Sequence, residues 1–194
     1  MDEIPRRRFI LDNPSIHFPP HVPEIRLRLA DEAHDLWLKT EDELAEIGLP
    51  PPFWAFAWAG GQALARHVLD HPQTVRGLRV LDLATGSGLV AIAAAMAGAQ
   101  GVLANDIDPF CSQAVALNVA LNGVAIDFDG RDLLAGAAPI EPFDVVLAGD
   151  VFYDREMAGA MLTFLDRCAA AGAVVLVGDP GRSYLPRHRL KQLS

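Results

Sequence analysis

A short apolar segment that runs straight into a glycine turn is the feature that most constrains the fold of this chain. Residues 78–82 are mostly apolar and end at Asp82, Gly86 and Gly88 follow, and a helical pattern occupies residues 88–97. A strand, a glycine turn and a helix N-terminus in this order form the usual binding site for a nucleotide-like cofactor. The segment therefore predicts a ligand at the carboxyl end of a buried strand.

The same alternation continues toward the C-terminus. Apolar runs predict further strands at residues 102–105, 124–128, 143–148 and 173–177. Helical patterns predict helices at residues 59–71, 109–122 and 156–170. We expect Asp108 to cap the second of these helices and Gly123 to end it. Strands that alternate with helices in this way imply an α/β fold, with a parallel sheet covered by helices on both faces.

The first fifty residues differ from the rest. Prolines recur between residues 5 and 23 and predict an irregular lead-in, and a half-exposed strand is expected at 25–29. A helical pattern over residues 31–48 follows. We therefore expect two parts: a strand and helix extension at residues 1–50, and one globular cofactor-binding domain at residues 51–194.

Composition argues against several classes of protein. With a formal net charge of −9, the chain is poorly matched to a phosphate backbone, so we expect no nucleic-acid partner. Residues 83–105 carry no charge, but glycines interrupt this alanine-rich stretch, which indicates two buried elements instead of a membrane span. Cys111 and Cys168 show no metal-ligand spacing. Because no targeting pattern is visible, we expect a cytoplasmic protein without a metal ion or a membrane partner.

Carboxylates follow the predicted strands, at the edge of the sheet where ligands bind. Asp82 lies beside the glycine turn, and Asp106 follows the next strand about twenty residues later, where it would bind ribose hydroxyls. A dinucleotide would bring its pyrophosphate close to Asp82, which is a repulsive pairing in a cleft of low dielectric constant. S-adenosylmethionine (SAM) instead carries a sulfonium and an ammonium group. The turn therefore favours SAM over NAD, unless Asp82 only caps the turn and touches no ligand.

Four segments carry a resemblance to a known family. Residues 51–65, 80–95, 148–154 and 178–182 resemble the electron transfer flavoprotein beta subunit lysine methyltransferases, which belong to the seven-strand SAM-dependent protein lysine methyltransferases. The most specific motifs are Trp-Ala-Gly-Gly-Gln in the first segment and Asp-Val-Phe-Tyr in the third. The resemblance implies a Rossmann-like class I methyltransferase sheet. Because such sheets normally end with two more strands, we expect this chain to lack the last C-terminal strands.

The resemblance also implies roles for particular residues. Asp150 and Tyr153 match the Asp-x-x-Tyr motif at the family's substrate lysine channel. Many relatives carry glycine at the position of Ala84, and we expect the alanine to be tolerated through a negative φ. The implied cofactor contacts are Trp58, Gly60, Gly61, Asp82, Ala84, Gly86, Gly88, Asp106, Ile107, Asp132, Leu133 and Ala148.

Asp150 and Tyr153 are chemically suited to methyl transfer. A carboxylate can hydrogen-bond a lysine amine and hold its direction, and an aromatic ring can wall the channel and attract the cationic product. The alternative is structural: Asp150 would cap the next helix and Tyr153 would pack on the core, as would Trp54, Phe56 and Trp58.

These observations predict a SAM-dependent protein-lysine N-methyltransferase that acts on the electron transfer flavoprotein beta subunit. One alternative is a ribosomal-protein methyltransferase of the same fold. Another is a catalytically silent SAM-binding interaction module, which the expected lack of C-terminal strands favours.

Overall fold

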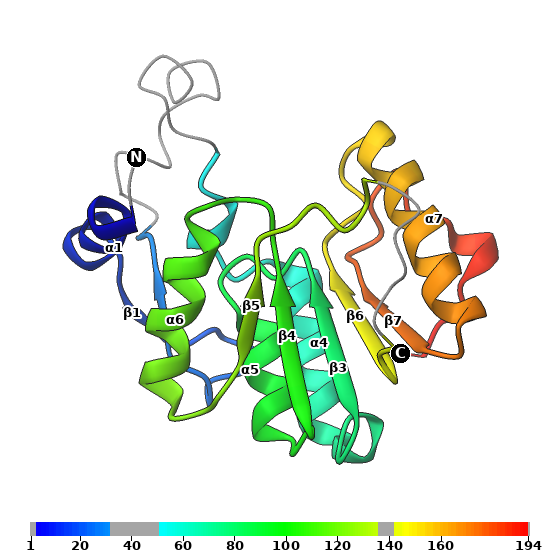
Figure 1. The fold of residues 1–194 in the computed structure, drawn as a ribbon, viewed down its shortest axis with the longest axis horizontal. Helices are drawn as coiled ribbons and strands as arrows, with labels where there is room; N and C mark the ends of the chain where they lie inside the picture. Colours follow the sequence, from blue (N-terminus) through cyan, green and yellow to red (C-terminus); the bar gives the residue numbers. More distant parts are fainter. Residues whose placement is uncertain (1–2, 32–50, 136–141, 194) are drawn as a thin grey trace.

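A five-stranded parallel sheet forms the centre of the molecule in a computed structural model that describes residues 3–31, 51–135 and 142–193 (Figure 1). The strands are β3 (Arg79–Leu83), β4 (Gly101–Asn105), β5 (Asp127–Asp129), β6 (Val145–Gly149) and β7 (Val174–Gly178). They lie in the order β5-β4-β3-β6-β7, and every pairing is parallel. Because β4 and β6 flank β3 on opposite sides, the strand order reverses there, which is where open α/β sheets bind ligands.

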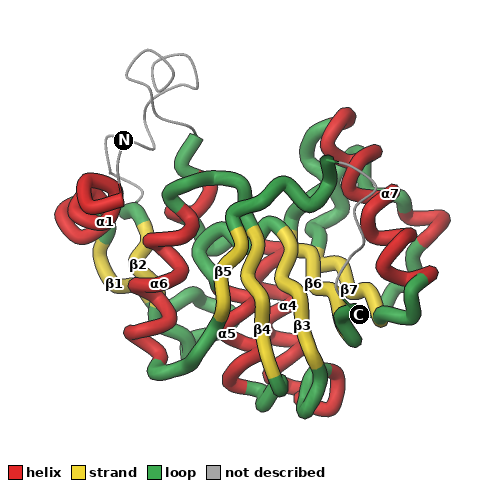
Figure 2. Tube along the Cα trace, in the orientation of Figure 1, coloured by secondary structure: helices red, strands yellow, loops and turns green. Residues whose placement is uncertain are grey.

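Helices cover both faces of this sheet, as the alternation predicts. Figure 2 shows α4 (Ala59–Asp70) and α5 (Leu89–Met96) behind the sheet, and α7 (Arg155–Ala170) beside β6 and β7. The side chains of β3 alternate: Val80 belongs to the core shared with α4 and α5, whereas Leu81 and Leu83 belong to the core shared with α7. Because successive residues of a strand point to opposite faces, this one strand supplies both halves of the core.

Helix α5 is short and made almost entirely of small apolar residues. Its sequence is Leu-Val-Ala-Ile-Ala-Ala-Ala-Met, and its residues 89–94 are all buried. The alanines allow close packing against β3, β4 and α4. The uncharged stretch at 83–105 is therefore a loop, a buried helix and a buried strand. None of the described helices is long and apolar enough to cross a membrane.

The N-terminal residues pack against α6 and its neighbours. The remaining elements of the described residues are α1 (Glu3–Asp12), β1 (Ser15–His17), β2 (Leu27–Leu29), α6 (Cys111–Asn122) and the 3-10 turns Phe53–Ala55, Pro72–Thr74 and Arg187–Arg189. Two asparagines of α6 hold the chain around β2 by its backbone. Asn118 Oδ1 accepts a hydrogen bond from Arg28 N at 2.7 Å, and Asn122 Oδ1 accepts one from Arg26 N at 2.9 Å.

Helix α1 corrects the prediction of an irregular lead-in over residues 1–23. Pro5 lies in the first turn of α1, where backbone N–H groups have no partner within the helix, so a proline is tolerated there. Farther along α1, Ile10 is fully buried in a cluster that includes Trp54 and Phe110. Tertiary burial therefore stabilises a helix that its proline content argued against. The helix predicted over residues 31–48 lies outside the described residues from residue 32 onward.

The start of α6 is a second correction. Helix α6 begins at Cys111 instead of residue 109, and Asp108 is not its N-cap. Asp108 Oδ1 accepts a hydrogen bond from Phe110 N at 2.8 Å, which closes a turn before the helix. At the other end Gly123 adopts φ +64° and its N–H bonds to Val119 O, so the predicted C-cap is confirmed.

Candidate active site

A cavity of about 550 Å³ lies beyond the carboxyl ends of β3, β4 and β6. Its wall combines the glycine turn after β3, the acidic loop after β4, the loop after β6 and an aromatic segment before α4. Of the predicted site residues, those that line it are Trp58, Gly61, Asp82, Ala84, Gly86, Asp106, Ile107, Asp150 and Tyr153. The others, Gly60, Gly88, Asp132, Leu133 and Ala148, do not line it.

Asp82 holds the glycine turn in place. Its side chain is buried, and Oδ2 accepts hydrogen bonds from Thr85 Oγ1 at 2.5 Å and from Ala91 N at 2.9 Å. Burial raises the pKa of Asp82 to about 7, although both hydrogen bonds oppose the shift. Asp82 therefore caps the turn, as the structural alternative held, and it also lines the cavity, where a cation would stabilise its ionised form.

The backbone at Ala84 differs from expectation. We expected a negative φ, but Ala84 has φ +55°. The left-handed region is costly for any residue with a Cβ atom because Cβ approaches the following carbonyl oxygen. The alanine is held there by the turn between Asp82 and Gly86, and Gly86 itself has φ +54°. The turn consequently carries backbone strain at a position where glycine would carry none.

Replacing Ala84 with glycine should stabilise the chain. We expect Ala84→Gly to raise the free energy of unfolding by about 1 kcal/mol, because the strain of the left-handed backbone disappears. Urea denaturation measures this change. Ala171→Gly is the matched control: Ala171 has φ −81°, so this variant should gain no stability. Equal effects at both positions would contradict strain at Ala84.

The loop after β4 is tied to the glycine turn. Asp106 Oδ2 accepts a hydrogen bond from Gly86 N at 2.9 Å, and Oδ1 accepts one from Asp108 N at 3.0 Å. Burial raises the pKa of Asp108 to about 6, and the charge of Asp106 adds to this shift. Asp108 lines the cavity but was predicted only as a helix cap. Its position two residues after Asp106 was the signal that could have identified it.

The loop after β5 makes contacts of its own. Asp132 Oδ1 accepts hydrogen bonds from Leu134 N at 2.9 Å and Ala135 N at 3.1 Å, so it caps a turn. Leu133 packs against the core on the α7 side. The predicted adenine contacts of Asp132 and Leu133 stay a prediction.

Aromatic side chains form one wall of the cavity. Trp58 Nε1 donates a hydrogen bond to Phe53 O at 2.9 Å, and the rings of Phe53 and Phe56 each lie 5.9 Å from that of Trp58. Phe53 also lies 5.6 Å from Tyr153, which is about half exposed. Trp54 differs, because it is buried and stacks on Phe110. Trp54 is thus a core aromatic that also borders the cavity, whereas Phe53, Phe56, Trp58 and Tyr153 line it from less buried positions.

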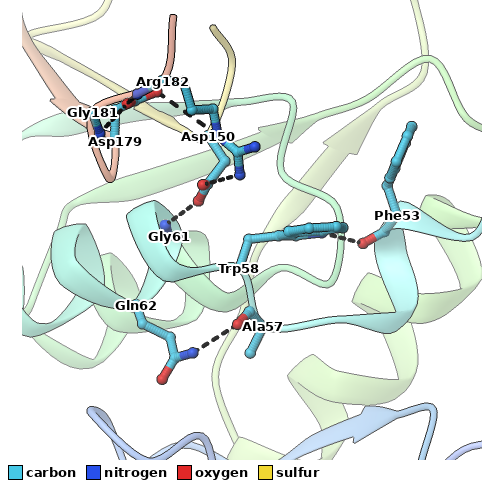
Figure 3. A network of polar contacts seen from close by, with 9 residues as sticks. All are labelled: Phe53, Ala57, Trp58, Gly61, Gln62, Asp150, Asp179, Gly181 and Arg182. Atoms are coloured by element: carbon cyan, nitrogen blue, oxygen red, sulfur yellow. Dashed lines mark hydrogen bonds and ion pairs between the residues drawn. The ribbon is translucent and has the colours of Figure 1, made fainter. Parts of the chain in front are cut away.

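Asp150 is held from two sides (Figure 3). Its Oδ2 accepts a hydrogen bond from Gly61 N, and its Oδ1 pairs with Arg182 Nη2, each at 2.7 Å. The backbone of Asp150 has φ +60°, and its N–H bonds to Gly178 O. The structural alternative for this residue is wrong, because Asp154 caps α7 by accepting a hydrogen bond from Met157 N. The side chain of Asp150 instead faces the cavity at the N-terminus of α4.

Arg182 lies in the segment 178–182 that carries the family resemblance, but no role was predicted for it. It follows β7, lines the cavity beside Asp150, and is the sole basic side chain among the described residues of the lining. The acidic residues of the lining are Asp82, Asp106, Asp108 and Asp150. The cavity is therefore suited to a ligand with positive charge and poorly suited to a pyrophosphate.

Known proteins resemble this chain in sequence. The sequence model of the family described as ribosomal protein L11 methyltransferase (PrmA) matches residues 63–151. An electron transfer flavoprotein beta subunit lysine methyltransferase from Xenopus laevis is 45% identical over 184 residues, which cover 94% of this chain and 73% of that protein. The Rattus norvegicus protein of the same name is 41% identical over 172 residues, which cover 88% of this chain and 66% of that protein.

Solved structures resemble it in fold. A ribosomal protein L11 methylase from Lactobacillus delbrueckii subsp. bulgaricus superimposes with a TM-score of 0.50 at 31% identity, over 62% of this chain and 60% of that chain. A T. thermophilus 16S rRNA methyltransferase in complex with AdoMet and guanosine superimposes with a TM-score of 0.55 at 23% identity, over 68% of this chain and 37% of that chain. At this identity the likeness shows the fold alone. The predicted class I methyltransferase fold is confirmed. With 94% of its residues aligned to a relative at 45% identity, the chain belongs to the electron transfer flavoprotein beta subunit lysine methyltransferase family.

Proposed function

We propose that this chain transfers methyl groups from SAM to lysine side chains of the electron transfer flavoprotein beta subunit. One observation carries the proposal: the glycine turn and the Asp150–Tyr153 motif open into the same cavity. A donor at the turn and an acceptor amine at Asp150 would then meet inside one site. The names of the family relatives supply the identity of the acceptor protein.

The residues present fit SAM as the cofactor. The cavity brings Asp82, Asp106 and Asp108 together, and α5 begins directly after the glycine turn, with Ala91 N donating to Asp82 Oδ2. We propose that Asp106 binds the ribose hydroxyls and that Asp82 stabilises the cationic methionine end. We further propose cofactor contacts for Trp58, Ile107, Asp132 and the other residues predicted from the sequence. When bound, SAM supplies an activated methyl group on a sulfonium ion.

The protein's part in the reaction is positioning. A neutral lysine amine would use its lone pair to form the new N–C bond. The methyl group would leave the sulfur of bound SAM with the C–S electron pair remaining on sulfur, and one proton would pass from the nitrogen to solvent. Asp150 accepts a hydrogen bond from the amine and aims its lone pair into the cavity. Phe53, Trp58 and Tyr153 exclude water and attract the methylated cation. We also propose that residues 51–194 form the methyltransferase domain and residues 1–50 an extension of it.

Transfer of a labelled methyl group tests this function. The chain is incubated with radiolabelled SAM and purified electron transfer flavoprotein beta subunit, and mass spectrometry locates the modified residues. Label on lysines of this subunit supports the proposal. The match to the PrmA family makes ribosomal protein L11 the second substrate to test. Transfer to L11 alone would favour that candidate, and SAM binding without transfer to either protein would favour a silent binding module.

Asp82 should make the affinity for SAM depend on pH. Because the pKa of Asp82 is raised to about 7, this carboxyl is mostly protonated at pH 6. A bound cation favours the carboxylate and lowers its pKa, so binding at pH 6 must release a proton. We expect the affinity to rise by about tenfold between pH 6 and pH 8 and to level off above that. Calorimetry at both pH values measures it, and equal affinities would contradict contact between Asp82 and the cation.

A further inference from the structure

Arg182 is fixed at the substrate end of the cavity by three neighbours (Figure 3). Its Nη2 lies 2.7 Å from Asp150 Oδ1, its Nε lies 4.0 Å from Asp179 Oδ2, and its guanidinium carbon lies 5.8 Å from the centre of the Trp58 ring. The backbone N–H of Arg182 also bonds to Asp179 Oδ1 at 2.7 Å. The Arg182 side chain is 27% exposed and that of Asp150 is 8% exposed. The ion pair is therefore mostly shielded from solvent.

A shielded carboxylate raises a difficulty for the proposed reaction. The acceptor must arrive as a neutral amine, but a lysine has a pKa of about 10.4 in water. An opposite charge within a few ångströms favours the protonated form further. A lone carboxylate at Asp150 would therefore hold the lysine as an ammonium ion, which has no lone pair for the attack.

The charged groups that line the cavity around this point are acidic apart from Arg182, and Arg187 lies outside the lining, where its Nη2 donates to Gly181 O at 3.1 Å. The loop after β6 contributes Asp150 and the loop after β7 contributes Asp179. Strand β3 contributes Asp82 near its carboxyl end, and the loop after β4 contributes Asp106 and Asp108. From the N-terminus of α4 the group that faces Asp150 is the Gly61 N–H, and the segment before it contributes the neutral Trp58. Arg182 is the one basic side chain of the described lining that offsets these carboxylates.

We propose that Arg182 is a positioning residue that, by pairing with Asp150, allows this carboxylate to align the substrate amine without trapping it as an ammonium ion. This inference rests on the proposed function. The second lone pair of each Asp150 oxygen stays available to accept a hydrogen bond from the amine. The guanidinium cancels most of the charge that would otherwise favour the protonated lysine, so the acceptor loses its proton at a lower pH.

The pH profile of the turnover number tests the inference. At saturating protein substrate, kcat reports ionisations in the bound complex. In Arg182→Gln we expect kcat to rise at a pH about one unit higher than in the wild type. The kcat of the variant is then about tenfold lower at pH 7.5 and approaches the wild-type value near pH 9.5. Arg182→Lys keeps the charge and should restore most of the wild-type profile. SAM affinity, measured by calorimetry, should stay within about threefold in both variants.

Two further variants make the test specific. Asp179→Asn removes a carboxylate that competes with Asp150 for Arg182. The asparagine Oδ1 can still accept hydrogen bonds from Gly181 N and Arg182 N, so the loop should keep its shape. Because one negative charge is lost, the pH profile of kcat should move to lower pH. This opposite shift is measurable even if Arg182→Gln folds poorly. Arg189→Gln removes an exposed ion pair with Asp166 at 2.9 Å and should leave the profile unchanged.

Each outcome decides the inference. A uniform loss of kcat at every pH in Arg182→Gln would mean that Arg182 is only structural. A gain of kcat at neutral pH would mean that Arg182 blocks the channel. Either result overturns the inference. An unshifted profile in an active chain overturns the inference alone. Absence of methyl transfer by the wild-type chain would overturn the proposed function, and this inference with it.

Discussion

Asp150→Asn is expected to lower kcat by about 100-fold, comparable with the loss of one preorganised group from a catalytic site. Asparagine keeps the shape of the side chain, and it tolerates the left-handed φ of +60° better than most residues. Its amide oxygen can still accept from Gly61 N, but it carries no charge for Arg182 and accepts more weakly from a substrate amine. Transfer of labelled methyl groups to the flavoprotein subunit, under saturating conditions, measures the loss.

Cofactor affinity separates this role from a general disturbance of the site. Since Asp150 is assigned to the acceptor, SAM affinity in Asp150→Asn should stay within about threefold of wild type in calorimetry. Asp154→Ala is the matched control four residues away. It removes the cap of α7 and should lower stability by about 1 kcal/mol while kcat is retained. Parallel losses of SAM affinity and kcat in Asp150→Asn would contradict its assignment.

Gly60→Ala is expected to destabilise the chain by about 3 kcal/mol, at the upper end of overpacking effects. A Cβ atom at Gly60 would lie 2.2 Å from Gly178 O and 2.7 Å from Asp150 Oδ2. The nearest contact is with backbone, which cannot rotate away, so the start of α4 would have to move off the ends of β6 and β7. Urea denaturation measures the loss of stability, and transfer of labelled methyl groups should fall because Asp150 shifts with the helix.

The adjacent glycine is the control for this effect. A Cβ atom at Gly61 would meet Asp150 Oδ2 and Val90 Cγ2 at 3.9 Å each, which is ordinary van der Waals contact. Alanine also favours the helical conformation over glycine by up to about 1 kcal/mol. Gly61→Ala should therefore lose no stability. If the two alanine variants lost equal stability, close packing of Gly60 on Gly178 would not be the cause.

The alternating strands and helices were predictable because their signal is local. Strand β3 shows an apolar run bounded by a turn, and α5 is apolar at every position, as a buried helix is. Gly123 ends α6 as predicted, because the left-handed C-cap needs only the residue itself. In contrast, α1 was missed because the burial of Ile10 against residues such as Trp54 and Phe110 depends on partners that are distant in sequence.

The candidate site was likewise predictable from the sequence only in part. Asp82 lies near the carboxyl end of β3, and Asp106 and Asp150 directly follow β4 and β6. Because parallel strands bring their carboxyl ends to one edge, the sequence could place these residues together. Their hydrogen bonds were not predictable. The positive φ of Ala84 is imposed by the closure of the turn, and Asp108 makes a turn where a cap was expected.

By itself, the sequence determined the class of fold, the family and the position of the glycine turn, because residue order and periodicity encode strands, helices and turns directly. Only the tertiary structure decided that Arg182 stands against Asp150 and that Gly60 lies on Gly178. Each of these contacts joins chain segments that are far apart in sequence. Side chains and backbone meet there because β6 and β7 end side by side under the start of α4, and no local pattern records that meeting.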